Sequence, residues 1–289
     1  MSDITKPGSV VVGVDGSAGG DAALSWAAHY AAQRRRPLLV VNAAHDGHGI
    51  EFTGYAVMRR DLTAAAHAVT DRAVERVHRN HPGLEVDLST PLADPREALL
   101  ERAAHASLLV VGTRGRGPVK ALLLGSVSEA VSGHASCPVA VVRPPEQGVG
   151  QVAGHVVVGV DASPTSTGAL DVAFDIATTE GRPLDVVHTW ATHDTLVDGS
   201  LSEQRRAQLE ENELWLSEAL GGYGEKYPDV TTVRHLPEDG VVETLVWLSR
   251  SASVIVVGSR GQTGLMAMAF SVSRAVVEQA HCTVLVVRS

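Results

Sequence analysis

The sequence predicts an α/β protein built from two tandem doubly wound α/β/α sandwich domains, each with a five-stranded, mainly parallel sheet. Two observations carry this prediction: short Val-rich runs alternate with amphipathic segments, and the whole pattern recurs at an offset of 146 positions. Continuous apolar runs are typical of strands buried on both faces, as in parallel sheets covered by helices. The 289 residues suit two domains of ordinary size.

The repeat keeps its register from the first predicted strand to the fourth. The offset aligns residues that end predicted strands: Gly13 with Gly159, Asp15 with Asp161, and Gly112 with Gly258. Residues 144–151 have the Pro- and Gly-containing composition of a linker. We therefore predict a first domain over 1–146 and a second over 152–289.

Within the first unit, five strands alternate with helices. Strands are predicted at Ser9–Val14, Leu38–Ala43, Leu84–Thr90, Leu108–Val111 and Val139–Arg143. Helices are predicted at Asp21–Arg35, Val57–Arg79, Pro95–His105 and about Ser126–His134. In the long second helix, the recurring apolar positions are Leu62, Ala65, Val69, Ala73 and Val77. Ser17 is suited to cap the first helix and Pro95 to occupy the first position of the third. The second unit repeats this order.

Charge and composition exclude several classes of function. The net charge is −9, and the first 146 residues are neutral, with 15 Lys and Arg against 15 Asp and Glu. The second half carries the acidic excess and no basic stripe appears, so we expect no binding to nucleic acid. The N-terminus lacks an apolar signal region and no run approaches 18 apolar residues, so we expect a cytoplasmic protein without a membrane span. Cys137 and Cys282 occupy matching places in the two halves and are interpreted as buried, reduced side chains.

The candidate ligand site lies where the first and fourth predicted strands end. In an open parallel sheet, ligands bind beyond the carboxyl ends of the strands. The glycines at 112, 115 and 117 allow backbone N–H groups to approach phosphate oxygens. Further on, Ser126 and Glu129 have the spacing of a capping box, which marks a helix N-terminus suited to an anion. Arg114 and Arg116 either add positive charge there or point into solvent.

These glycines resemble a known motif. Gly112-x-x-Gly115, nine residues and then Gly125-Ser126 is similar to the G-2x-G-9x-G-[S/T] motif of ATP-binding universal stress proteins. Val-Gly-Val-Asp near the start and the segment 137–142 are similar to the flanking signatures of that family. The resemblance covers both halves and is closest to the tandem-domain members of actinobacteria.

The resemblance implies an ATP site in the first unit. It places Asp15 beside the ribose and phosphates, and adenine near Gly13 and Ala43. The residues assigned to the nucleotide are Gly13, Asp15, Ala43, Gly112, Thr113, Arg114, Gly115, Arg116, Gly117, Pro118, Gly125, Ser126 and Val127. A bound Mg²⁺ is compatible with this site, but no residue is assigned as its ligand.

The second unit keeps only part of the motif. Its corresponding residues are Gly159, Asp161, Gly258, Ser259, Arg260, Gly261, Gly264, Ser271 and Val272. Eight residues, not nine, separate Gly261 from Phe270, which stands where the first unit has Gly125, and Arg274 replaces Glu129. A phenylalanine ring at the phosphate approach predicts weaker, altered or absent nucleotide binding.

Other candidate sites are weaker. His45-Asp46-Gly47-His48 fits the H-x-G-H pattern of nucleotidylyl transferases, but it follows the second strand rather than the first. The same side chains are weak candidates for a metal site. Ser17 and Ser163 lack the surroundings of a nucleophile and are interpreted as helix caps. Three tryptophans of the second half are interpreted as core or interface packing: Trp190, Trp215 and Trp247.

The sequence therefore predicts an ATP-binding regulatory protein without an assigned catalytic residue. Neither a Walker A loop nor a clear general base is present. The alternatives are a slow ATPase or a nucleotidyl or phosphoryl transferase of related fold, and a purely structural interaction module. The apolar last strands, Val139–Val142 and Val284–Val287, are suited to pairing with each other, as the resemblance implies. A homodimer of whole chains and a regulatory protein partner remain expectations.

Overall fold

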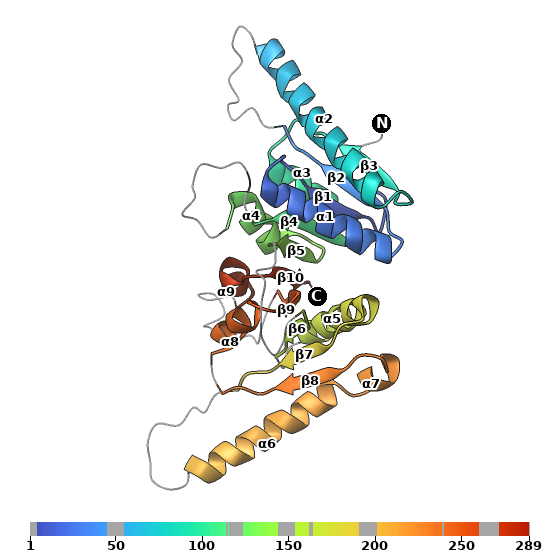
Figure 1. The fold of residues 1–289 in the computed structure, drawn as a ribbon. Helices are drawn as coiled ribbons and strands as arrows, with labels where there is room; N and C mark the ends of the chain where they lie inside the picture. The colour runs from blue at the N-terminus through green and yellow to red at the C-terminus, as the bar shows by residue number, and fades with distance from the viewer. Residues whose placement is uncertain are drawn as a thin grey trace. The chain divides into compact units, whose positions relative to one another are not determined.

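A computed structural model describes residues 5–44, 55–113, 115, 124–143, 154–161, 164–190, 201–238, 240–259 and 272–288. Strands and helices alternate along these residues, as the sequence predicts (Figure 1). The chain divides into two compact units, Met1–Pro144 and Pro145–Ser289. His45–His48, which fits the transferase pattern, lies outside the described residues.

The first unit contains a parallel sheet whose strands follow the order β3-β2-β1-β4-β5. The strands are β1 (Val10–Gly13), β2 (Leu38–Val41), β3 (Val86–Ser89), β4 (Leu108–Gly112) and β5 (Val139–Val142). Each neighbouring pair is parallel. The chain order reverses between β1 and β4, so this unit has its topological switch point where those two strands end.

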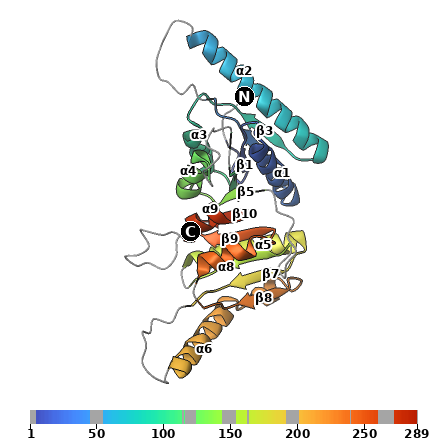
Figure 2. The same cartoon turned by 60° about the vertical axis from the view of Figure 1, so that its left-hand side comes forward.

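Helices cover both faces of this sheet. They are α1 (Ala18–Gln33), α2 (Tyr55–Asn80), α3 (Pro95–Ala103) and α4 (Ser126–His134). In Figure 2, α3 and α4 lie to the left of the sheet and α1 lies to its right. α1 and α2 contact each other, as do α3 and α4. The unit is therefore a doubly wound α/β/α sandwich.

Capping side chains determine where α1 and α3 begin. The Ser17 side chain accepts a hydrogen bond from the Gly20 N–H, so the predicted cap of α1 is confirmed, and the helix begins at Ala18 rather than Asp21. Asp94 caps α3, and Pro95 stands in its first turn, as predicted. Near the middle of α2, Ala66 is buried in place of the predicted Ala65, which is exposed.

The second unit repeats the architecture with the strand order β10-β9-β6-β7-β8. Its strands are β6 (Val156–Gly159), β7 (Leu184–Val187), β8 (Thr232–His235), β9 (Val254–Gly258) and β10 (Thr283–Val287), and neighbouring pairs are parallel. Its helices are α5 (Pro164–Glu180), α6 (Leu201–Ala219), α7 (Tyr223–Lys226), α8 (Val241–Leu248) and α9 (Val272–Gln279). The single-turn α7 has no counterpart in the predicted pattern.

Burial agrees with the Val-rich interpretation of the strands. Val10, Val11 and Val12 are completely buried. Cys137 and Cys282 are buried, as expected, and neither forms a disulfide. Of the second-half tryptophans, Trp190 is buried, whereas Trp247 is 61% exposed, so Trp247 does not pack in the core and its place at an interface stays a prediction. None of the described helices is long and apolar enough to cross a membrane.

Candidate functional site

Asp15 is fixed at the beginning of α1, directly after β1. The strand pairing continues one residue past β1, where the Val14 N–H donates to the Val41 carbonyl. Asp15 Oδ1 then accepts a hydrogen bond from the Ser17 N–H at 2.9 Å. The Ser17 hydroxyl in turn accepts from the Gly20 N–H at 3.1 Å. The carboxylate is therefore held at a helix N-terminus by local backbone geometry.

The glycines after β4 lie against this part of α1. A Cβ atom at Gly112 would lie 2.5 Å from the Gly19 carbonyl oxygen. A Cβ atom at Gly115 would lie 2.5 Å from Asp15 Oδ2. Both distances are shorter than real Cβ contacts. At Gly112 the obstacle is backbone, so glycine is required there, whereas a side chain at Gly115 would displace the Asp15 carboxylate. The structure thus brings Asp15, the start of α1 and two glycines of the loop to one edge of the sheet.

The start of α4 is tied to the same loop. The Gly125 N–H donates to the Thr113 carbonyl at 2.8 Å. The buried Ser128 hydroxyl donates to the Gly112 carbonyl at 2.7 Å and lies 3.3 Å from the Thr113 carbonyl oxygen. The first turn of α4 therefore lies beside the end of β4.

The predicted capping box at α4 is wrong. The N-cap is Gly125, in an extended conformation, and no side chain caps the helix. Ser126 is already inside the first turn, so its hydroxyl is not at the capping position. The first intrahelical bond runs from the Glu129 N–H to the Gly125 carbonyl. The N–H groups of Ser126, Val127 and Ser128 therefore have no acceptor within the helix, which is the arrangement that suits an anion.

The remaining assigned residues of the first unit fall into two groups. Gly13 and Ala43 lie at the same carboxyl edge, since Gly13 pairs with Val41 and the Ala44 N–H donates to the Pro91 carbonyl. The others lie outside the described residues: Arg114, Arg116, Gly117 and Pro118. Among the described residues, no group of three or more His, Cys, Asp or Glu side chains is arranged to hold a metal ion.

The second unit holds its aspartate differently. Ser166, at the position of Gly20, accepts a hydrogen bond from the Asp161 N–H at 2.8 Å and donates to Asp161 Oδ1 at 2.7 Å. At the end of β9, the Ser259 N–H donates to the Val287 carbonyl. The Thr113 N–H donates in the same way to the Val142 carbonyl of β5 in the first unit. The residues that follow lie outside the described part, including Arg260, Gly261, Gly264, Phe270 and Ser271, while Val272 begins α9.

His188 adds a second difference at this edge, and sequence reasoning missed it. It occupies the position of Asn42 under the repeat offset. Its Nδ1 lies 3.1 Å from the Val160 carbonyl oxygen and its Nε2 lies 2.8 Å from Asn212 Oδ1. The ring also packs against Trp215, with centroids 4.4 Å apart. A buried imidazole thus covers the carbonyl that follows Gly159.

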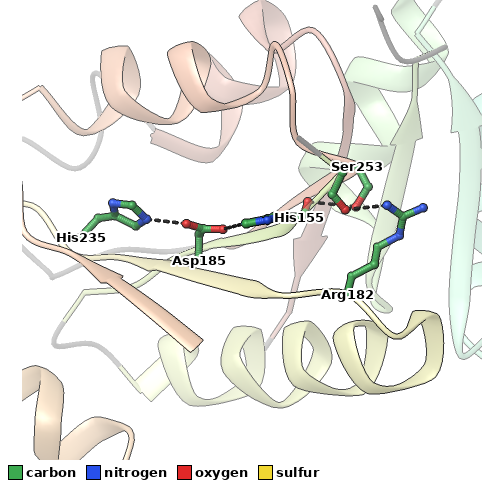
Figure 3. A network of polar contacts seen from close by, with 6 residues as sticks. His155, Arg182, Asp185, His235 and Ser253 are labelled. Atoms are coloured by element: carbon green, nitrogen blue, oxygen red, sulfur yellow. Dashed lines mark hydrogen bonds and ion pairs between the residues drawn. The ribbon is translucent and has the colours of Figure 1, made fainter. Parts of the chain in front are cut away.

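A further polar network in the second unit was also missed (Figure 3). The Asp185 carboxylate, on β7, is buried between two imidazoles: His155 Nδ1 lies 2.5 Å from Oδ2 and His235 Nε2 lies 2.5 Å from Oδ1. The register of β6, β7 and β8 places the two histidines diagonally on either side of the aspartate. The signal available in the sequence was an aspartate inside an apolar strand, where the first unit has Leu39.

The fold and this edge define a class, the doubly wound α/β proteins whose ligand site lies at the carboxyl ends of parallel strands. The model of the universal stress protein family matches residues 8–143 and again residues 153–288. The chain therefore belongs to the universal stress protein family, with two copies of its domain.

Individual relatives agree with this assignment over the full length. The chain is 36% identical to the universal stress protein Rv2005c of Mycobacterium tuberculosis, with 100% of this chain and 99% of the relative covered. It is 33% identical to Rv1996 of the same organism, with 96% and 94% covered. The crystal structure of a universal stress protein from Archaeoglobus fulgidus has a TM-score of 0.70 at 20% identity, covering 99% of this chain and 98% of that chain. This last likeness supports the fold.

Proposed function

We propose that the protein binds ATP in its first unit and that nucleotide occupancy regulates a stress response. The observation that carries the proposal is the meeting of three elements at one sheet edge. These are the Asp15 carboxylate, the close-packed glycines 112 and 115, and the uncapped first turn of α4. Membership in the universal stress protein family supports the same assignment.

Each element suits a different part of the nucleotide. The free N–H groups at the start of α4, together with the positive end of the helix dipole, are suited to phosphate oxygens. A carboxylate accepts hydrogen bonds and repels phosphate, so Asp15 would accept from the ribose hydroxyls. Gly13 and Ala43, at the ends of β1 and β2, would lie beside adenine. Bound Mg²⁺ would offset the charge of the triphosphate.

The second unit is expected to bind ATP more weakly or not at all. The Asp161 carboxylate is already engaged by the Ser166 hydroxyl, and His188 covers a neighbouring backbone carbonyl. A ribose hydroxyl would have to compete with the first contact. These two differences, like Phe270 in place of the motif glycine, predict weaker ATP binding in the second unit.

Equilibrium titration with ATP tests the proposal. We expect saturable binding to the wild-type chain and a loss of at least about tenfold in affinity for Asp15→Ala, because a charge-assisted hydrogen bond to the ribose is removed. Asp161→Ala, the matched substitution in the second unit, is expected to leave the dominant affinity unchanged. Binding that survives Asp15→Ala but is lost in Asp161→Ala would contradict the assignment to the first unit.

Slow hydrolysis or group transfer is the second candidate activity. The glycine edge supplies phosphate-binding groups, but its carboxylate, Asp15, is assigned to the ribose hydroxyls and no residue is assigned as a general base. ATP turnover abolished by Gly112→Ala but retained in His45→Ala would place a slow ATPase at the glycine edge. Loss of turnover in His45→Ala would instead favour the transferase pattern.

A further inference from the structure

The Ser128 side chain connects the two structural elements of the proposed phosphate site. It lies in the first turn of α4 and is only 3% exposed. Its hydroxyl does not bond to its own helix but donates to the Gly112 carbonyl at 2.7 Å, with the Thr113 carbonyl oxygen at 3.3 Å. A buried hydroxyl in this place cannot contact a ligand at the surface, so any effect on a ligand acts through the groups that it holds.

The groups held by Ser128 are those that face the proposed phosphates. On one side is the first turn of α4, whose leading N–H groups have no intrahelical acceptor and no side-chain cap. On the other side is Gly112, where the chain leaves β4 and passes against the Gly19 carbonyl. The Gly125 N–H bond to Thr113 is the second link between the same two elements. Removing the hydroxyl would leave the Gly112 carbonyl without this donor.

Ser128 lies just outside the G-2x-G-9x-G-[S/T] spacing, which ends at Ser126. The spacing aligns the glycines along the chain, but it does not fix the direction of the α4 amides relative to the loop. We propose that Ser128 is the positioning residue that sets this direction and thereby determines affinity for the phosphates. This inference rests on the proposed ATP site in the first unit.

Loss of the Ser128 hydroxyl should weaken phosphate-bearing ligands selectively. Adenosine carries the base and ribose but no phosphate, so its binding depends on Asp15 and the ends of β1 and β2. ATP and ADP also need the amides of α4. We expect Ser128→Ala to weaken ATP binding about tenfold and to leave adenosine binding unchanged. A general loss of packing would weaken both ligands equally.

Matched variants separate the hydroxyl from the space that it fills. Ser132→Ala is the control on the same helix, because the Ser132 side chain is only partly buried and donates to the Glu129 carbonyl of its own helix at 3.1 Å. Ser128→Thr keeps the hydroxyl. Ser128→Val has the shape of the threonine variant but lacks the hydroxyl. We expect the threonine variant to bind ATP more tightly than the valine variant by about tenfold, whether or not the alanine variant folds.

The experiment is a titration of the full chain and these variants with ATP and with adenosine, after circular dichroism has verified folding. Weakened ATP binding with unchanged adenosine binding in Ser128→Ala, restored in Ser128→Thr, supports the inference. Equal ATP affinities for the threonine and valine variants, or parallel losses for ATP and adenosine, overturn it. A wild-type chain that binds neither ligand would instead refute the proposed function itself.

Discussion

Gly112→Ala places a methyl group where the end of β4 meets the start of α1. The new Cβ would lie 2.5 Å from the Gly19 carbonyl oxygen and 2.6 Å from its carbonyl carbon. Both are backbone atoms, so no side-chain rotation relieves the overlap, and α1 or the loop has to move. Overpacking of this kind costs about 1–3 kcal/mol of stability. Because Asp15 and Gly115 belong to the displaced segments, ATP affinity is expected to fall at least about tenfold.

The control for this substitution is Gly133→Ala in α4, where no heavy atom lies within 4 Å of the added Cβ. Replacing a helical glycine with alanine is expected to raise stability by about 0.5–1 kcal/mol without changing ATP binding. Thermal unfolding and ATP titration of both variants measure the two effects. A Gly112→Ala protein with wild-type stability and affinity would refute the close approach on which the site depends.

Two further predictions concern stability. Arg35 has φ 51°, in the left-handed region that favours glycine, and the equivalent residue is Gly181 with φ 61°. Arg35→Gly is therefore expected to stabilise the first unit by up to about 1 kcal/mol, as measured by urea unfolding. A destabilised variant would contradict this explanation. For the second unit, His155→Ala removes one partner of buried Asp185 and is expected to cost about 1–3 kcal/mol, reduced from a fully buried pair because the imidazole is partly exposed. Asp185→Leu, which restores the residue type of Leu39, is expected to stay within about 1 kcal/mol of wild type or to exceed it. The reverse order of these two stabilities would argue against the contacts of Asp185 with the two imidazoles as the explanation.

The strand and helix order was predictable because it depends on patterns that are local in the chain. Val10–Val12 form a continuous apolar run of β-branched residues, which is typical of a strand buried on both faces. Ser17 was recognisable as a cap because it directly precedes a helical pattern. The repeat offset then transferred the same assignments to the second unit.

The finer details of the α4 start were not predictable from spacing. Ser126 and Glu129 have capping-box spacing, but spacing alone does not distinguish an N-cap residue from the first residue inside a helix. That distinction depends on the backbone angles of Gly125, which are extended. The role of Ser128 as a link to the Gly112 carbonyl depends on contacts between distant elements, and a linear pattern does not contain them.

The polar contacts of the second unit were missed for a related reason. Asp185, His155 and His235 are 30 to 50 residues apart in their hydrogen-bonded pairs. Only the strand register brings them together. His188 likewise meets Asn212 from another element. The offset comparison shows that positions 39 and 185 differ, but it does not show which side chains surround the aspartate.

The central claim is that one ATP binds per chain, in the first unit. Native mass spectrometry of the full-length protein, at an ATP concentration just sufficient to fill the stronger site, tests it most directly, because it reports ligand number for each oligomeric species. The account predicts one nucleotide per chain, lost in Gly112→Ala and retained in Gly258→Ala. A nucleotide-free spectrum, or two equivalent nucleotides per chain, would contradict it.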